Sequence, residues 1–521
     1  MQQFSRHTVL LFISTLLAGC SSLPMRGEVP ESRAFQDTAT TSLARVVAAS
    51  RAPEETAPSG FGLLLEGEFA YDARGALLHR AERSLDLQYY TIHRDQSGRM
   101  LLRELRDAAQ RGVRVRLLVD DSHAAEIQDL LVGLATYANA EVRLFNPLPM
   151  RHGAPVIRIV LSPGDFQLYN HRMHNKLFIA DNAVAIYGGR NVADEYFMKN
   201  DVANFIDFDA ISTGRVVADL SAVFDRYWNS LSSWPVHTVL GVPADQAEAR
   251  RQFDVAVEDA HVPAPETATD LMGLASTETQ LRDGRLKLSY AAAEVHADPP
   301  EKASDPALAM QPTVAVSALL NAFSSAKREV LIVSPYFVPG EVGMPLIRQA
   351  RANGVRISIF TNSLGSTDVP LVHRSYASYR LAMLRLGVDL YEVSPTQTRR
   401  SRRFGDFGRS IPRLHAKVAV VDRQRLLVGS ANMDGRSAVG NTELGVIIDD
   451  AVLANKMARR IADESFTSVY KLRLLPDGNS IEWIDTDEDG QTSATREEPD
   501  SGWWVRLKLW LLSLVVAERD L

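Results

Sequence analysis

Two stretches of the chain repeat the same set of reactive side chains at the same spacing. Each fits the template H-x-K-x4-D-x6-G-[GS]-x-N, the first starting at His174 and the second at His415. Two matches, 241 residues apart (415 − 174), indicate a duplicated functional site far more strongly than one match does. The matched positions are His174, Lys176, Asp181, Gly189 and Asn191 in the first stretch, and His415, Lys417, Asp422, Ser430 and Asn432 in the second.

Each stretch supplies one nucleophile or proton donor, one cation and one amide. An imidazole titrates near neutral pH, so a histidine can act as nucleophile, acid or base. Two repeats that face each other would place two histidines, two lysines and two asparagines around one centre. The single cysteine, Cys20, excludes disulfides within the chain and a metal site built from several thiolates.

The spacing also predicts how each stretch folds. A histidine and a lysine two residues apart on a strand point to the same face. The apolar residues that follow, Leu177–Ala180 and Val418–Val421, continue a buried strand. The motif aspartate then marks a turn and a second strand returns. The Gly-Gly or Gly-Ser step allows a tight bend that directs the asparagine back towards the site.

The segments around these motifs form two similar βαβ patterns. In each half a strand is followed by a helix, a glycine that ends the helix, and an apolar strand. Such units predict a parallel sheet covered by helices, and therefore an α/β fold. The predicted strand, helix and strand occupy 81–92, 98–110 and 112–120 in the first half, and 326–338, 344–352 and 354–361 in the second.

The duplicated motif resembles the signature of the phospholipase D superfamily, over residues 60–235 and 313–475. The resemblance implies two similar α/β sandwich halves with one active site at their interface, and a phosphodiester as the reacting group. It implies that one histidine attacks phosphorus and becomes a phosphohistidine. The other protonates the leaving alcohol and then deprotonates the incoming one. By family analogy the expected nucleophile is His174, and neither a metal nor another cofactor is implied.

Each catalytic histidine needs an acceptor for its second ring nitrogen, and in this family a carboxylate downstream of the motif supplies it. The resemblance suggests Glu443 as the partner of His415. It suggests Asp207 as the partner of His174, with Asp209 as the alternative to Asp207.

The remaining motif positions have supporting roles in the family. Asp181 and Asp422 are expected to be structural turn residues, although they are usually counted with the site. The residues expected to bind or support the phosphate are Asn191, Asn432, Gly189 and Ser430.

Further local matches resemble bacterial cardiolipin synthases, and most closely their C-type branch. This resemblance implies transfer of a phosphatidyl group to phosphatidylglycerol, with phosphatidylethanolamine or a second phosphatidylglycerol as donor. The matching segments are 87–90 (LQYY), 172–176 (RMHNK), 188–197 (GGRNVADEYF), 361–364 (TNSL) with Asp368 and Tyr376, and the tryptophan-rich C-terminal segment.

Residues 1–20 have the layout of a secretory signal peptide. Arg6 gives a positive start, the apolar run 9–17 is too short to span a bilayer comfortably, and small residues follow. Residues 17–20 (LAGC) resemble a bacterial lipobox, which implies lipidation of Cys20. The expected location is the cell envelope of a Gram-negative bacterium, anchored by lipid and facing the periplasm. The alternative is an ordinary signal peptide with a chance cysteine. Most cardiolipin synthases instead carry transmembrane helices, so the choice of inner or outer membrane stays open.

The rest of the chain divides around the two halves. Residues 21–60 and 235–312 are rich in proline and small residues, and they predict a flexible tether and a linker or insertion. The first half occupies residues 61–234 and the second residues 313–475. Residues 476–521 contain an acidic loop and a segment of tryptophan, leucine and valine. We expect this segment to be a membrane-interfacial helix, with packing on the protein's own core as the alternative.

Net charge bears on the class of substrate. The formal net charge of −7 argues against a nucleic-acid partner, because phosphate backbones favour basic surfaces. Phospholipids and a membrane surface are the expected partners, and the duplication within one chain favours a monomer. The competing functions are a phospholipase D hydrolase with water as acceptor, a nucleic-acid phosphodiesterase, and a membrane protein with a decayed site. The intact motifs argue against decay.

Seven isolated histidines have no motif around them, and we expect each to be structural or solvated. They are His79, His93, His123, His237, His261, His296 and His373.

Overall fold

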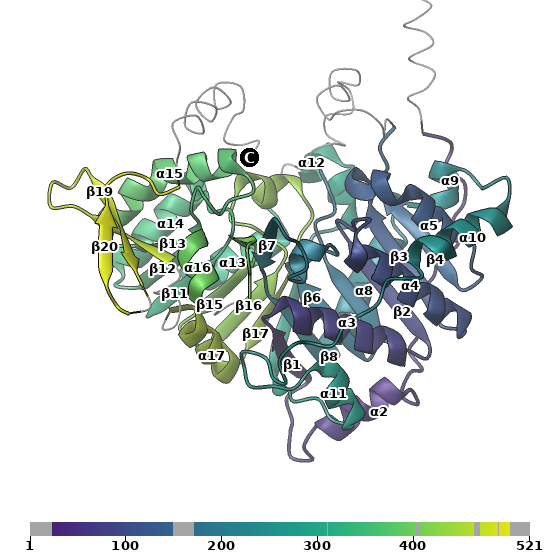
Figure 1. The fold of residues 1–521 in the computed structure, drawn as a ribbon. Coiled ribbons are helices and arrows are strands. Elements are labelled where there is room, and N and C mark those ends of the chain that lie inside the picture. Colours follow the sequence, from purple (N-terminus) through teal and green to yellow (C-terminus); the bar gives the residue numbers. More distant parts are fainter. Residues whose placement is uncertain are drawn as a thin grey trace, which may run out of the picture.

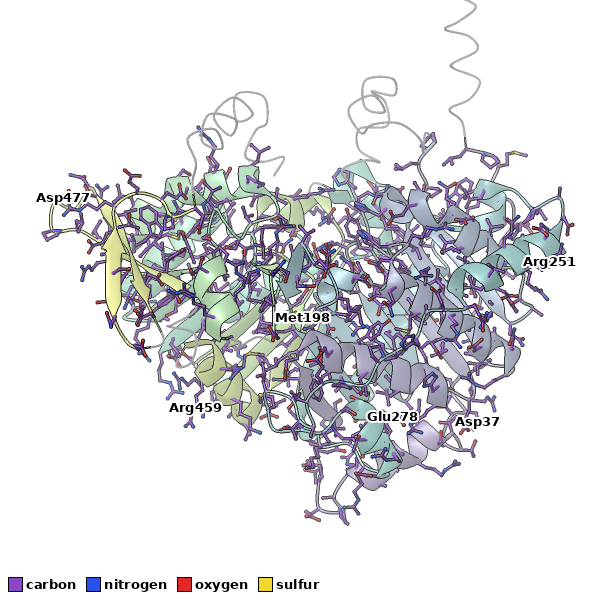
Figure 2. All side chains as sticks on the ribbon, viewed as in Figure 1. Asp37, Met198, Arg251, Glu278, Arg459 and Asp477 are labelled. Atoms are coloured by element: carbon purple, nitrogen blue, oxygen red, sulfur yellow. The ribbon has the colours of Figure 1, made fainter. Side chains whose placement is uncertain are left out.

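The chain forms a long sheet with helices packed on its faces, and its two halves lie side by side (Figure 1). This computed structural model describes residues 23–149, 171–309, 311–401, 406–462, 469–487 and 489–500. Figure 2 places Arg251 and Asp477 at opposite ends of the molecule, with Met198 close to the boundary between the halves. The signal sequence, Cys20 and the expected C-terminal helix lie outside the described residues.

The first half contains a mixed sheet in the order β9-β4-β3-β2-β5-β6-β8-β1. Strands β2, β3 and β4 are parallel, as the βαβ pattern predicts, and the other pairs are antiparallel. The strands are β1 (Ser59–Leu64), β2 (Ser84–Tyr89), β3 (Arg114–Asp120), β4 (Ala140–Phe145), β5 (Leu177–Ala180), β6 (Val184–Gly188), β7 (Ala203–Ile206), β8 (Asp209–Gly214) and β9 (Ser233–Pro235).

The second half repeats this order as β18-β13-β12-β11-β15-β16-β17. Parallel strands β11, β12 and β13 correspond to β2, β3 and β4, which confirms the predicted duplication. The strands are β11 (Glu329–Val333), β12 (Arg356–Asn362), β13 (Asp389–Val393), β14 (Ile411–Leu414), β15 (Val418–Val421), β16 (Arg425–Gly429), β17 (Leu444–Asp449), β18 (Val469–Leu474), β19 (Ile481–Thr486) and β20 (Thr492–Thr495).

The helices that follow the first parallel strands end where the sequence predicts. Gly112 and Gly354 come directly after them with φ of +93° and +80°, the left-handed conformation that favours glycine at a helix end. The longer helices are α3 (Gly67–Arg80), α4 (Gln96–Gln110), α8 (Arg215–Trp228), α13 (Val314–Ser324), α14 (Gly340–Ala352), α15 (Pro370–Arg385) and α17 (Ala451–Ala462). The other helices are α2 (Ser42–Ser50), α5 (Gln128–Leu134), α9 (Val236–Leu240), α10 (Gln246–Val257), α11 (Thr277–Arg282), α12 (Pro306–Ala309) and α16 (Pro395–Ser401), and tighter or wider turns are η1 (Asp121–Ile127), η3 (Asp194–Tyr196), η4 (Pro300–Ala303) and η5 (Arg436–Gly440).

The segment predicted as a linker or insertion joins the two halves into one sheet. Its strand β10 (Ser289–Ala297) pairs antiparallel with β1 of the first half and with β17 of the second. One apolar core also crosses the boundary, because Trp228 and Phe224 belong to the same buried cluster as Met457 and Val446. Residues 235–312 therefore help to fix the position of one motif relative to the other.

The prediction of a free tether over residues 21–60 is wrong for the described part. Arg26 donates to the backbone oxygens of Ser233 and Ser230 at 2.9 and 3.0 Å. The backbone N–H of Ala34 donates to Asp225, and Leu43 of α2 is fully buried. Outside α2, this segment lies along other elements as an extended chain and has no periodic apolar pattern. Its composition alone therefore did not indicate that it packs on the protein.

The predicted acidic loop after residue 485 is largely a hairpin at the outer edge of the second half, coloured yellow in Figure 1. Strands β19 and β20 extend the sheet beyond β18. After the hairpin, Glu498 accepts hydrogen bonds from Arg380 and contacts His373, both on α15. In the described part of the chain, no helix is both long and apolar enough to cross a membrane.

Candidate active site

The two halves meet through short parallel strand pairings directly before the catalytic histidines. Strand β14 pairs with β7, and a bridge joins Met173 to Thr442. The backbone N–H of His415 donates to Ile206 at 2.8 Å, and that of His174 donates to Thr442 at 3.0 Å. Both imidazoles are buried and line the same cleft of about 340 Å³ between the halves.

Each histidine contacts a carboxylate from the opposite half. His174 Nδ1 lies 3.0 and 3.1 Å from the two carboxylate oxygens of Glu443, and His415 Nδ1 lies 2.6 Å from Asp207 Oδ2. The sequence identified both carboxylates but assigned them to the wrong histidines, since it paired each with the histidine of its own half.

The strand register explains this exchange. In the β14–β7 pair Leu414 lies opposite Ile206. The residues that follow them on the two parallel strands, His415 and Asp207, are therefore neighbours. In the same way the bridge between Met173 and Thr442 makes His174 a neighbour of Glu443. Neither half can therefore form a complete histidine–carboxylate pair without the other.

The two carboxylates are held differently. Glu443 accepts a hydrogen bond from Ser430 Oγ at 2.5 Å, and its backbone N–H donates to Asp298. Asp207 instead accepts from the backbone N–H of Phe208 at 2.8 Å. It lies so close to Gly189 that a Cβ there would come within 2.1 Å of Asp207 Oδ1. Ser430 and Gly189, predicted to support the phosphate, thus contact the carboxylates.

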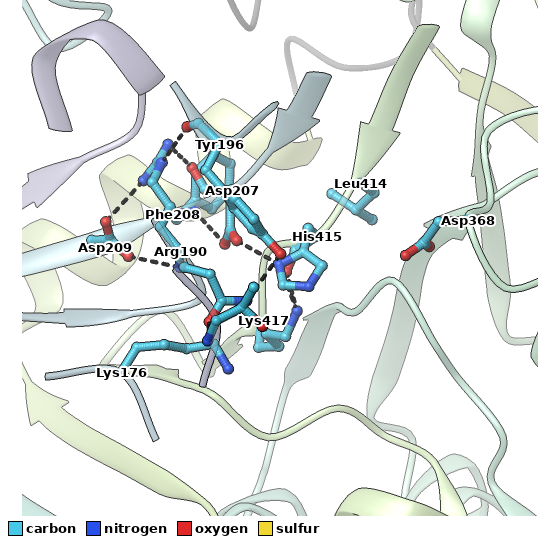
Figure 3. A network of polar contacts seen from close by, with 12 residues as sticks. Lys176, Arg190, Tyr196, Asp207, Phe208, Asp209, Asp368, Leu414, His415 and Lys417 are labelled. Atoms are coloured by element: carbon cyan, nitrogen blue, oxygen red, sulfur yellow. Dashed lines mark hydrogen bonds and ion pairs between the residues drawn. The ribbon is translucent and has the colours of Figure 1, made fainter. Parts of the chain in front are cut away.

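Figure 3 shows Asp207 between His415 and Arg190, whose guanidinium group is held by several polar contacts. The Arg190 guanidinium donates to the backbone oxygen of Asp207 and, at 3.3 Å, to that of Tyr196. It also forms an ion pair with Asp209 at 3.3 Å. Asp209, the alternative partner in the sequence analysis, therefore fixes Arg190 and Arg74 and does not contact a catalytic histidine.

The motif lysines lie beside their own histidines, although each pair directly precedes its strand, β5 or β15, and does not lie on it as predicted. Lys176 Nζ donates to the backbone oxygen of His174 at 2.6 Å. Lys417 Nζ donates to the backbone oxygen of His415 and lies 2.9 Å from His415 Nδ1. Both ammonium groups are buried in the protein between the halves.

Burial and mutual repulsion set the protonation of these groups. Burial lowers the pKa of His174 to about 4, against the opposing effect of Glu443. Burial, with the positive charge of Lys417, lowers the pKa of His415. Burial raises the pKa of Asp207. Burial also acts to raise the pKa of Glu443, but His174 and Lys176 outweigh it and lower that pKa below its usual value.

The same burial disfavours the protonated, cationic form of both lysines, so we expect activity to fall as pH rises. It lowers the pKa of Lys176 to about 7 and that of Lys417 to about 8. A lysine must be protonated to stabilise phosphate oxygens, and it loses the proton as pH rises through its pKa. The two lysines should therefore add a decline of kcat/KM between pH 7 and 8 to the loss of the His415 proton, which its lowered pKa places at lower pH. Lys176→Arg stays charged and should move the decline to higher pH, and a decline unchanged by this substitution would contradict the assignment.

The motif asparagines border the same cleft. Asn191 accepts from the backbone N–H of Thr91 and donates to Tyr196 Oη at 3.0 Å. The side-chain oxygen of Asn432 is buried without a hydrogen-bond partner among the described residues. The Asn432 amide is thus placed to meet a ligand, while Asn191 is partly committed to the protein.

The motif aspartates Asp181 and Asp422 lie away from the cleft and hold turns, as predicted. Asp181 has a φ of +52° and accepts from the backbone N–H groups of three residues that precede β2 or begin it. Asp422 has a φ of +54° and does the same before β11. The Asp181 donors are Glu82, Arg83 and Ser84, and the Asp422 donors are Lys327, Arg328 and Glu329.

We expect Asp181→Ala to lower the free energy of unfolding by about 3 kcal/mol, because buried N–H groups lose their acceptor. Asp181 is completely buried, whereas Asp422 is half-buried and the residues it caps are more exposed. Asp422→Ala is therefore the matched control, with an expected loss of about 1 kcal/mol. Urea unfolding of both variants at pH 7 tests this, and an equal or reversed order would contradict it.

Several cleft residues were not identified as site residues from the sequence. Tyr90 packs edge-on against His174 with ring centroids 5.1 Å apart, and its hydroxyl lies 2.9 Å from His123 Nε2. Tyr196 packs in the same way against His415 at 5.2 Å. His93 and His123, expected to be structural or solvated, line the cleft. None of these cleft residues belongs to the repeated motif. Only the position of the LQYY segment next to the site could have suggested them from the sequence.

Charged residues of both signs border the cleft. Asp368 lies near His415 (Figure 3), and its carboxylate accepts from Tyr336 Oη at 2.6 Å, while Glu195 is a second acidic lining residue. Arg436, with His93 and His123, also borders the cleft. Within the described residues, no group of three or more histidine, cysteine, aspartate or glutamate side chains is arranged to bind a metal ion.

A protein-family model and several known proteins are similar to this chain. The family model described as "Cardiolipin synthase, PLD-like domain" matches residues 76–228 and 319–464, one segment in each half. "Cardiolipin synthase C" of Escherichia coli (strain K12) is 36% identical over 453 residues, covering 86% of this chain and 93% of that protein. "Cardiolipin synthase" of Geobacillus kaustophilus is 24% identical over 405 residues, covering 77% of this chain and 65% of that protein.

A solved structure shares the fold. Phosphatidylserine synthase of Haemophilus influenzae Rd KW20 superposes with a TM-score of 0.51 and 15% sequence identity, covering 79% of this chain and 87% of that one.

Proposed function

Because the chain belongs to the family of phospholipase D-like cardiolipin synthases, we propose that it moves a phosphatidyl group from one phospholipid to phosphatidylglycerol and so makes cardiolipin. The donor is phosphatidylethanolamine or a second phosphatidylglycerol. The observation that carries the proposal is the crossed arrangement of two histidine–carboxylate pairs on one cleft.

In the first step His174 Nε2 attacks the phosphorus of the donor lipid. The bond from phosphorus to the headgroup oxygen breaks, and His415 delivers a proton to that oxygen as the alcohol leaves. The product is a phosphatidyl group bound to His174. Asn432, which lines the cleft, contacts the non-bridging oxygens, and the buried cations Lys176 and Lys417, each directly beside its histidine, stabilise their charge.

In the second step His415, now lacking that proton, takes one from a glycerol hydroxyl of phosphatidylglycerol. The hydroxyl oxygen attacks phosphorus, the bond to His174 Nε2 breaks, and cardiolipin leaves. Both histidines return to their starting states, so the atoms and charges balance over the cycle.

The different surroundings of the Glu443 and Asp207 carboxylates favour His174 as the nucleophile. A phosphorylated imidazole carries positive charge that an ionised carboxylate on the other nitrogen stabilises. The pKa of Glu443 is held low by His174 and Lys176, and Ser430 donates to it, so it is anionic at neutral pH. Burial raises the pKa of Asp207, which suits a partner that shares a proton with the acid–base histidine.

The location follows from the same proposal. Substrates that are bilayer lipids require an enzyme held at a membrane surface. We infer attachment through a lipid on Cys20, with the catalytic halves facing the periplasm. Palmitate labelling of the wild type and of Cys20→Ala tests this, since loss of label without loss of protein is expected.

Incubation of the purified protein with phosphatidylglycerol, with and without phosphatidylethanolamine labelled in its acyl chains, tests the reaction. Mass spectrometry of the lipids should show cardiolipin, and label in cardiolipin together with free ethanolamine identifies phosphatidylethanolamine as the donor. Phosphatidic acid without cardiolipin would establish a hydrolase instead. Unchanged lipids together with cleavage of a nucleic acid would establish a nuclease.

A further inference from the structure

Helix α13 carries few polar side chains and yet lies at the surface. Its sequence is VAVSALLNAFS, and its buried residues are Ala315, Val316, Ala322 and Phe323. Its first residue, Val314, is 40% exposed, and Leu319 and Leu320 are only partly buried. Its polar residues Ser317, Asn321 and Ser324 follow at i, i+4 and i+7 and so form one stripe, and the apolar residues Val316, Leu320 and Phe323 lie on the flank of α13 beside that stripe.

The corresponding helix of the first half is covered. α3 precedes β2 as α13 precedes β11, and 11 of its 14 residues are buried, against 4 of 11 in α13. The segment around α11 lies over α3: Glu278 donates its backbone N–H to Asp72 and forms an ion pair with Arg80. α13 packs on strands β10, β15 and β17, and within the described part of the chain seven of its eleven residues stay partly or fully exposed.

An apolar cavity of about 300 Å³ lies between α13 and α14. Val316, Leu320 and Phe323 form one wall, and Val342 and Leu346 form the other. Val342 is 66% exposed. The cavity thus has apolar walls and an apolar residue exposed to solvent.

This cavity adjoins the catalytic cleft. Asn432 and Asp434 line both spaces. Asn432 belongs to the motif and carries a buried amide oxygen without a partner in the described residues. A phospholipid whose phosphate lies beside Asn432 would therefore have its glycerol and acyl chains at the entrance to the apolar cavity.

We propose that the cavity between α13 and α14 binds an acyl chain of the phosphatidyl donor. This inference rests on the proposed function, since it takes a lipid as the ligand of the cleft. Within the described residues, the second half buries less of α13 than the first half buries of α3, as a ligand site beside α13 requires. The second half then holds the lipid by its tail, and both halves act on the phosphate.

Photocrosslinking of the wild-type protein tests the site directly. The probe is phosphatidylglycerol with a diazirine at the end of one acyl chain, and the adducts are mapped by mass spectrometry of peptides. Adducts on peptides containing α13 and α14 are expected. Adducts only elsewhere, including on the C-terminal segment, would overturn the inference. The experiment needs no turnover, so its outcome is separate from that of the cardiolipin assay.

Two substitutions make the test specific. Ser317→Phe fills the cavity from α13, and Val342→Asp places a charge at an exposed position in its wall. Each should lower the crosslinking yield on α13 and α14 by about fifteenfold, because losing contact with two methylenes costs a factor of about four for each. Val452→Asp on α17, where the valine is 59% exposed, is the control and should leave the yield unchanged. Equal yields in all three variants would contradict the proposal.

Discussion

Replacement of His174 by alanine should abolish phosphatidyl transfer, and replacement of His415 should lower it by about 10²- to 10⁴-fold. The two losses have different causes. Without His174 no bond to phosphorus can form, whereas without His415 the bond forms but the leaving alcohol receives no proton. A phosphatidyl ester of p-nitrophenol separates these cases, because nitrophenolate leaves without protonation. His415→Ala should release one nitrophenol per enzyme in a rapid burst, and His174→Ala should release none.

The control for this experiment is His261→Ala, which removes an exposed imidazole outside the cleft and should behave as wild type. A burst in His174→Ala and none in His415→Ala would reverse the assignment of nucleophile and acid. Substantial turnover by either alanine variant with a natural lipid would contradict the two-histidine mechanism itself. Circular dichroism of each variant checks that the fold is kept.

The sequence predicted which candidate catalytic residues the fold brings together, because their identities and spacing are local properties of the chain. His174 and Lys176 lie on one short stretch, and the repeated motif required a second copy at His415 and Lys417. The strand and helix order around them was also predictable, since periodicity and helix-ending glycines are local signals. The duplication then implied two similar halves and a site at their interface.

The partners of the histidines could not be predicted in the same way. Asp207 lies 33 residues after His174 (207 − 174) and Glu443 lies 28 after His415 (443 − 415), so spacing favours pairs within each half. The true pairs depend on the register of β7 against β14 and of Met173 against Thr442, which is a property of the assembled halves. No local pattern in either half contains that register.

Other elements were missed for a related reason. Strand β10 has an irregular burial pattern and lies among prolines, so its sequence resembles a linker although it joins the two sheets. Tyr90 and His123 reach the cleft because the ends of β2 and β3 lie at the same edge of the sheet. Their contacts with each other and with His174 follow from tertiary packing and have no counterpart in the motif.

The crossed pairs lead to the second expected result, which concerns the carboxylates. Glu443→Gln and Asp207→Asn keep the size of the side chain but remove the charge, and each should lower kcat by about 10²- to 10⁴-fold. Because Glu443 contacts His174, Glu443→Gln should slow the nitrophenol burst. Because Asp207 contacts His415, Asp207→Asn should leave the burst fast and slow only the turnover of natural lipids. The pairing within each half would predict the opposite assignment.

A pH profile distinguishes an electrostatic role of Glu443 from a merely structural one. The carboxylate raises the pKa of His174, which burial nevertheless lowers to about 4. A histidine nucleophile must be neutral, so activity rises as pH increases through this pKa. Glu443→Gln removes the stabilising charge, and the acid limb of kcat/KM should therefore move to lower pH. Ser430→Ala removes only the hydroxyl that donates to Glu443, so it should cause a smaller loss of rate and leave the limb near its wild-type position. An acid limb unchanged in Glu443→Gln, despite a large loss of rate, would mean that the carboxylate orients the ring without tuning its charge.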